Sequence, residues 1–145
     1  VDEALSEART ACLLAHPNIV TVHDFEIEGD YAYLVMEFVD GLNLSELLAR
    51  VEGGYLTYAE AAHMISSLAK ALQYAHENGV LHLDIKPTNI MIDRQGTVKL
   101  ADFGMATLAS AAGYGGARGG TVGYMPPEQA CLLTSVLIFS RLLLF

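Results

Sequence analysis

Two short apolar runs, residues 90–92 and 98–101, stand on either side of a polar Asp-Arg-Gln-Gly turn, and they constrain the fold more than any other feature of the chain. Such runs around a turn predict a β-hairpin. A hairpin returns the chain to its starting point. We therefore expect Asn89, which precedes the hairpin, to lie beside Asp102, which follows it.

The segment before the hairpin, residues 82–89, concentrates side chains that suit phosphoryl transfer. Moving a γ-phosphoryl group requires oxygen ligands for Mg²⁺, a carboxylate that takes the proton of the incoming hydroxyl, and a cation near the phosphate. We predict Asp84 as the base and Lys86 as the cation. Asn89 and Asp102 are the predicted Mg²⁺ ligands, because carboxylate and amide oxygens suit this ion. Any one of these residues alone would more often be a turn or surface residue.

The same residues resemble the catalytic segment of a eukaryotic-like, bacterial-type serine/threonine protein kinase, with its His-x-Asp, Asn and Asp-Phe-Gly motifs in order. Lys86 and Thr121 favour the serine/threonine branch over the tyrosine branch. The resemblance covers about residues 3–130, and further motifs extend it on both sides: 6–9 and 16–20 resemble the αC helix and the loop behind it, 33–41 the fifth strand and hinge, and 120–128 the end of an activation segment.

The resemblance implies an α+β fold and a partial kinase-like domain over residues 1–130. Residues 1–36 would be an N-lobe remnant with αC and the fourth and fifth strands, and 37–41 would be the hinge. Residues 42–130 would be the upper, helical part of the C-lobe with the catalytic loop and activation segment. The apolar tail 131–145 does not match the family.

ATP and Mg²⁺ are the cofactors that this resemblance implies. Glu37 and Val39 would offer backbone groups to adenine, with Met36 as gatekeeper and Met91 beneath the ring. Glu7 matches the αC glutamate that pairs with the ATP-binding lysine. Thr121 would bond to Asp84 and shape the loop that docks the substrate, and a regulatory spine would stack Ala11, Val22, His82 and Phe103.

Local patterns predict the remaining elements. Helices are expected over residues 3–14, over about 44–51 after an Asn43 cap, and from a Thr57 capping box to Asn78-Gly79. Strands are expected over 19–27 and 31–38, joined by a turn. The glycine-rich residues 110–120 predict a loop. The long helix would bury an apolar face made of Ala61, Met64, Ile65, Leu68, Ala71, Leu72 and Ala75.

Composition excludes several classes of function. The chain has 17 acidic and 8 basic residues in 145, for a net charge of -9, which argues against a protein that tracks nucleic-acid phosphates. Two cysteines far apart and no signal peptide at the start predict a reducing, cytoplasmic setting. The tail has 15 residues with Arg141 inside, too few for the roughly 20 that span a bilayer.

Three departures from the family pattern shape the functional expectation. The sequence contains neither the Gly-rich phosphate loop nor the strand-three lysine. Leu83 replaces an arginine that normally pairs with a phosphorylated activation loop, so activity should not depend on that phosphorylation. We interpret residues 131–145 as a truncated or frameshifted end rather than a short hydrophobic helix.

The leading hypothesis is a protein kinase that phosphorylates serine or threonine hydroxyls of a protein substrate, with weak activity in this chain alone. A non-catalytic, pseudokinase-like interaction module is the alternative, although the presence of Asp84, Asn89 and Asp102 counts against it. A small-molecule phosphotransferase is a third reading, which Lys86 and Phe103-Gly104 make less favoured.

Overall fold

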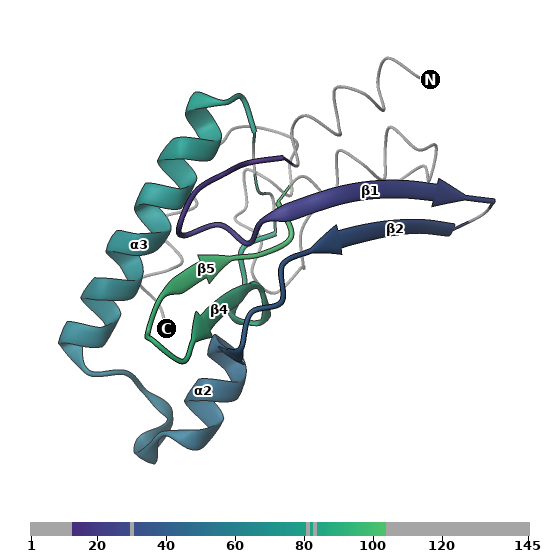
Figure 1. The fold of residues 1–145 in the computed structure, drawn as a ribbon. Helices are drawn as coiled ribbons and strands as arrows, with labels where there is room; N and C mark the ends of the chain where they lie inside the picture. Colours follow the sequence, from purple (N-terminus) through teal and green to yellow (C-terminus); the bar gives the residue numbers. More distant parts are fainter. Residues whose placement is uncertain (1–12, 30, 81, 83, 104–145) are drawn as a thin grey trace, which may run out of the picture.

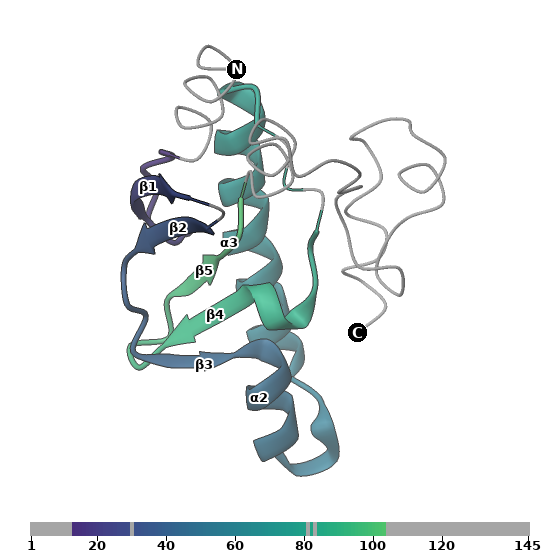
Figure 2. The ribbon, with the colours of Figure 1, turned by 90° about the vertical axis from the view of Figure 1, so that its right-hand side faces the viewer.

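A computed structural model of the chain describes residues 13–29, 31–80, 82 and 84–103. These residues form the predicted α+β architecture, with a two-stranded sheet, a three-stranded sheet and two α-helices. The hairpin of β1 and β2 projects away from the rest, whereas the long helix α3 runs alongside β5 in both views (Figures 1 and 2). No helix of the described residues is long and apolar enough to cross a membrane.

The first hairpin pairs β1 (Val22–Glu28) with β2 (Tyr31–Met36) in antiparallel register. Gly29 in its turn has a φ of 60°, a conformation in which the absence of a Cβ removes the steric penalty. The predicted boundaries were wrong at two places, because β1 starts later than Ile19 and β2 ends before Phe38. Ile19 instead forms a parallel bridge to Leu100 of β5.

The second sheet has the order β3-β4-β5 and contains the hairpin predicted before the Asp102 motif. Its strands are β3 (Gly41–Asn43), β4 (Ile90–Asp93) and β5 (Val98–Leu100). The Asp93 carboxylate holds the turn by accepting the main-chain N–H groups of Gln95 and Thr97, each at 2.9 Å. β3 was not predicted, and Gly41, expected as the last hinge residue, is its first residue.

The predicted starts of the second and third helices are confirmed by their caps. Asn43 accepts the Glu46 N–H at the start of α2 (Leu44–Arg50), and a 3-10 turn η1 (Glu52–Gly54) follows this helix. Thr57 and Glu60 form a complete capping box at the start of α3 (Tyr58–Glu77), which ends at Asn78 as predicted. A capping box satisfies two otherwise unpaired donors, so a local sequence signal fixes the start of this 20-residue helix.

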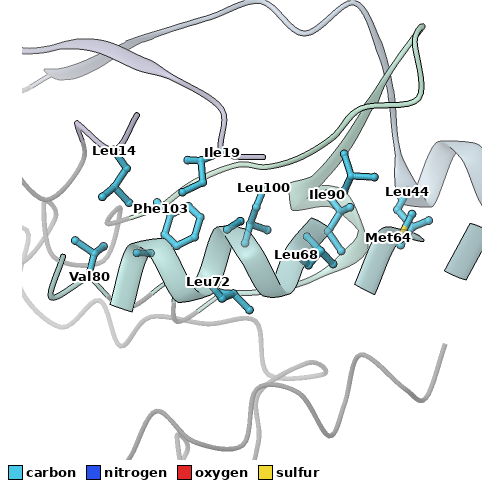
Figure 3. Close-up of a cluster of buried hydrophobic side chains, with 13 residues drawn as sticks. Leu14, Ile19, Leu44, Met64, Leu68, Leu72, Val80, Ile90, Leu100 and Phe103 are labelled. Carbon is cyan, nitrogen blue, oxygen red and sulfur yellow. The ribbon is translucent and has the colours of Figure 1, made fainter. Parts of the chain in front are cut away.

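The hydrophobic core lies between α3 and the β4–β5 hairpin (Figure 3). Leu68 and Leu72 of α3 are fully buried together with Ile90 and Leu100 of the hairpin. Burying a side chain of this size stabilises a fold by about 1.5–3 kcal/mol. Of the predicted apolar face, Ala61 and Ile65 are only partly buried, and Ser67 is buried although it was not predicted.

Several predictions concern residues outside the described part of the chain. They are the helix over 3–12, Glu7, Ala11, Leu83, the loop 110–120, Thr121 and the tail 131–145. Where the predicted first helix enters the described range, at Leu13 and Leu14, the backbone is not helical.

Candidate catalytic and nucleotide-binding site

The second hairpin brings the two predicted metal ligands together. Ala101, next to Asp102, donates its N–H to the Asn89 carbonyl at 2.8 Å, immediately beyond the pairing of Ile90 with Leu100. Asn89 ends a short 3-10 turn, η2 (Pro87–Asn89). Its side-chain amide donates to the Asp84 carbonyl at 2.9 Å. One asparagine thus links the loop that carries Asp84 to the segment that carries Asp102.

His82 forms a second link between the same two segments. Its Nδ1 lies 3.0 Å from the Asp84 N–H and must accept it, so its Nε2 carries the hydrogen and donates to the Ala101 carbonyl at 2.6 Å. The ring is almost fully buried and packs edge-on against the Phe103 ring, with 4.6 Å between the two ring centroids. Burial lowers the pKa of His82, and the Ala101 carbonyl offsets only part of this effect. The imidazole is therefore held neutral, the form that its two hydrogen bonds require.

Asp84 and Lys86 form an ion pair, with Lys86 Nζ 3.2 Å from the Asp84 carboxylate. Both side chains are partly buried, at 29% and 25% exposure, so the pair faces an accessible part of the loop. This contact brings the predicted base and the predicted phosphate-binding cation to the same point. An exposed hydroxyl substrate and a phosphate could meet there.

Asp102 adopts a left-handed backbone conformation with φ 63°, which no other non-glycine residue of the described chain shares. A positive φ is uncommon outside glycine, and such conformations cluster at functional sites. The bond from Ala101 to Asn89 and the bond from His82 to Ala101 fix the backbone immediately before it. The backbone that carries Asp102 is thus held by two other segments of the chain.

The donor set fits Mg²⁺ in chemical type. The Asn89 amide nitrogen is used by Asp84, which leaves its side-chain oxygen as the ligand atom, and Asp102 adds a carboxylate. Within the described residues, no group of three His, Cys, Asp or Glu side chains could hold a metal ion by itself. Mg²⁺ commonly takes one or two protein oxygens and completes its shell with phosphate and water, as this pair of residues would allow.

The predicted hinge is tied to the β4–β5 hairpin through Glu37. Its carboxylate accepts the Thr21 N–H at 2.9 Å and pairs with Lys99 Nζ of β5 at 3.0 Å. Burial by itself raises the pKa of Glu37, but the bond from Thr21 and the charge of Lys99 outweigh it, so this pKa lies below its ordinary value. Sequence reasoning missed Lys99, because it separates two buried strand residues and resembles a solvated position.

The other predicted nucleotide contacts lie on two elements near this hinge. Met36 ends β2 with 39% of its surface exposed, and Met91 of β4 lies opposite Lys99 in the sheet. A cavity of about 190 Å³ is lined by residues 37–40, 93–95 and Lys99. Of the predicted adenine contacts, Glu37 and Val39 line this cavity, whereas Met36 and Met91 do not.

Of the predicted spine, His82 and Phe103 are in contact and Val22 is buried. The roles assigned to the site residues stay predictions. What the structure adds is the pairwise bonding that holds Asp84, Lys86, Asn89 and the backbone before Asp102 in one place.

Comparison with known proteins gives a consistent result. The protein kinase domain model matches residues 2–134. Serine/threonine-protein kinase PrkC of Bacillus subtilis is 41% identical over 126 residues, which cover 86% of this chain and 19% of that protein. PknA of Mycobacterium tuberculosis is 42% identical over 137 residues, covering 90% of this chain and 31% of that protein.

Among solved structures, the Mycobacterium tuberculosis PknI kinase domain superposes with a TM-score of 0.65 at 30% identity. The alignment covers 71% of this chain and 42% of that kinase domain. The chain therefore spans less than a third of the length of the PrkC and PknA relatives and less than half of this solved domain.

Proposed function

The chain belongs to the protein kinase family, and from that membership and the site geometry we propose that it carries the catalytic loop of a serine/threonine protein kinase. The reaction would be ATP- and Mg²⁺-dependent transfer of the γ-phosphoryl group to serine or threonine hydroxyls of a protein substrate. The setting would be cytoplasmic. We propose this activity for the whole protein, because the chain spans only 19% of the length of PrkC and 31% of the length of PknA.

One observation supports this proposal most directly, namely the double connection across the site. His82 and Asn89 each bond to the Asp84 loop and to Ala101, so the base and the backbone before Asp102 are held by four hydrogen bonds. A chain whose loop served only as a docking surface would not require the two carboxylates to be fixed relative to one another. Phosphoryl transfer does require it, because positioning supplies most of the catalysis.

Each residue would then have a distinct role. Asp84 would orient the substrate hydroxyl and accept its proton, while Lys86 would move from the Asp84 carboxylate to offset charge on the phosphoryl oxygens. Mg²⁺, when bound, would neutralise charge on the phosphate. Asn89 and Asp102 would hold that ion, and His82 would keep both segments in register without touching the substrate.

The test measures γ-phosphate transfer to a generic protein substrate and MgATP binding by thermal shift, both on the 145-residue chain. We expect weak transfer, because the sequence of this chain contains neither a Gly-rich loop nor a strand-three lysine. Asp84→Asn should abolish the transfer and leave MgATP binding in place. Glu26→Gln, an exposed acidic position on β1, is the matched control and should change neither.

Two outcomes would contradict the proposal. A folded chain that shows no thermal shift with MgATP would favour a docking module without nucleotide chemistry. Transfer to small amino-sugars but not to proteins would instead indicate a small-molecule phosphotransferase.

A further inference from the structure

The ladder between β1 and β2 ends in an irregular pair, Thr21 and Glu37. In a hydrogen-bonded antiparallel pair, two residues exchange two main-chain bonds. Here Glu37 donates its N–H to the Thr21 carbonyl at 2.8 Å, as expected. The Thr21 N–H, however, donates to the side-chain Oε1 of Glu37 at 2.9 Å and not to its main-chain carbonyl. The carboxylate has taken the place of the carbonyl in the ladder.

This exchange leaves the main-chain carbonyl of Glu37 outside the sheet. Among the described residues, no donor is hydrogen-bonded to that oxygen, and none of their acceptors is hydrogen-bonded to the N–H of Val39 two residues later. Asp40, the next residue, is again engaged, because its carbonyl accepts the Arg94 N–H at 3.0 Å. The Glu37 carbonyl, an acceptor, and the Val39 N–H, a donor two residues on, are therefore among the main-chain groups of this segment that remain for a ligand.

Lys99 holds the carboxylate in the position that makes the exchange possible. Its Nζ lies 3.0 Å from each carboxylate oxygen of Glu37, a contact that fixes the rotation of the carboxylate as well as its position. The two side chains are only 19% and 24% exposed, so water screens the pair weakly. Lys99 comes from β5, 62 residues away in sequence, and is thus a tertiary support for the hinge.

We infer that Lys99 is a positioning residue for the adenine base: by keeping the Glu37 carboxylate on the Thr21 N–H, it keeps the Glu37 carbonyl available to the 6-amino group of a purine. This inference rests on the proposed function, because it assumes that adenine binds at residues 37–39. A Glu37 carbonyl kept available in this way would make the site select 6-aminopurines over 6-oxopurines. Without Lys99, the carboxylate would be released, the Thr21 N–H would take the main-chain carbonyl, and that carbonyl would be lost to the ligand.

A neighbouring ion pair provides a matched control. Arg94 and Asp40 also connect the β4–β5 turn to the hinge, with 2.9 Å between Arg94 Nε and the carboxylate. Their side chains are 80% and 61% exposed, and neither side chain is bonded to the Thr21–Glu37 pair. Exposed ion pairs of this kind contribute little to the stability of a fold. Arg94→Met therefore removes a cation from the same turn without touching the ladder end.

The experiment compares binding of MgATP and MgITP, whose purine carries a 6-oxo group, to the full 145-residue chain by calorimetry. We expect the unmodified chain to prefer ATP. Lys99→Met should reduce that preference about threefold to tenfold, the range for one hydrogen bond. Lys99→Arg should restore it, because guanidinium pairs with both carboxylate oxygens. Arg94→Met should keep the original ratio.

A merely structural role for Lys99 would weaken ATP and ITP binding equally. An unchanged ATP:ITP ratio in Lys99→Met, with ATP bound by the unmodified chain, would thus overturn this inference and leave the proposed function standing. Failure of the unmodified chain to bind either nucleotide would overturn both. Glu37→Gln gives a second measurement should Lys99→Met not fold: its amide oxygen can still accept the Thr21 N–H but loses Lys99, so the ratio should fall by a smaller factor.

Discussion

Replacing His82 with phenylalanine tests whether its two hydrogen bonds, and not its bulk, hold the catalytic loop. Phenylalanine keeps an aromatic ring in a site that is 1% exposed and can retain the edge-on contact with Phe103. It cannot accept the Asp84 N–H or donate to the Ala101 carbonyl. Leaving a buried polar group without its partner costs about 1–3 kcal/mol. With two such groups, we expect the free energy of unfolding at pH 7.5 to fall by about 2–6 kcal/mol.

The pH dependence of this loss gives a sharper test. Burial lowers the pKa of His82 in the folded chain, so below the ordinary value of about 6.5 the unfolded chain binds a proton that the folded chain does not. The stability that neutral His82 contributes is therefore present above about pH 6.5 and declines as the pH falls toward the folded-state pKa. The carboxylates of Asp84 and Asp102 oppose this shift, while Lys86 and burial favour it.

Urea unfolding of the unmodified chain and of His82→Phe at several values between pH 7.5 and pH 5.5 measures both effects. The difference in unfolding free energy between the two proteins should narrow as the pH falls, at no more than about 1.4 kcal/mol per pH unit for one proton. The other four histidines are common to both proteins, so their contributions cancel in the difference. A difference that stays constant, or that widens at low pH, would refute the assignment of His82 as a neutral, doubly bonded imidazole.

Two further substitutions test the elements that support the site. Gly41→Ala would place a Cβ 1.9 Å from the Ile92 carbonyl oxygen and 2.7 Å from the Asp93 Cα, so β3 must move away from β4. We expect the free energy of unfolding to fall by about 1–3 kcal/mol. An unchanged free energy of unfolding would contradict the observed pairing of β3 with β4. Thr57→Ala removes the cap of α3 and should cost about 1 kcal/mol in urea unfolding, whereas Ser66→Ala, at an exposed position of the same helix, should cost nothing measurable.

Prediction from the sequence worked best for elements whose boundaries are set by contacts between residues close together in the chain. The start of α3 follows from Thr57 and Glu60, three residues apart, and its end from Asn78-Gly79, so both boundaries could be placed without any tertiary information. The β4–β5 hairpin was equally accessible, because its turn is held by Asp93 and two N–H groups within four residues. Signals of this kind lie within one window of sequence.

What could not be predicted depends on partners far along the chain. β3 has three residues and exists because it pairs with β4, about 50 residues later, and three residues carry too little pattern to be recognised alone. Ile19 was assigned to a strand on its β-branched neighbours, but it bridges to Leu100 instead of β2. Lys99 resembled a solvent-facing strand position, and only the fold shows that it meets Glu37.

The position of β5 explains why these long-range contacts matter for the site as a whole. Three successive residues of this segment each bond to a different part of the chain: Lys99 to Glu37 in the hinge, Leu100 to the backbone of Asn18 and Val20, and Ala101 to His82 and Asn89. A shift of this segment along its axis would therefore disturb the hinge and the backbone before Asp102 together. Since an extended segment transmits such a shift over three residues with little slack, the proposed base-binding and metal-binding ends of the site are set by one rigid element and not by two independent loops.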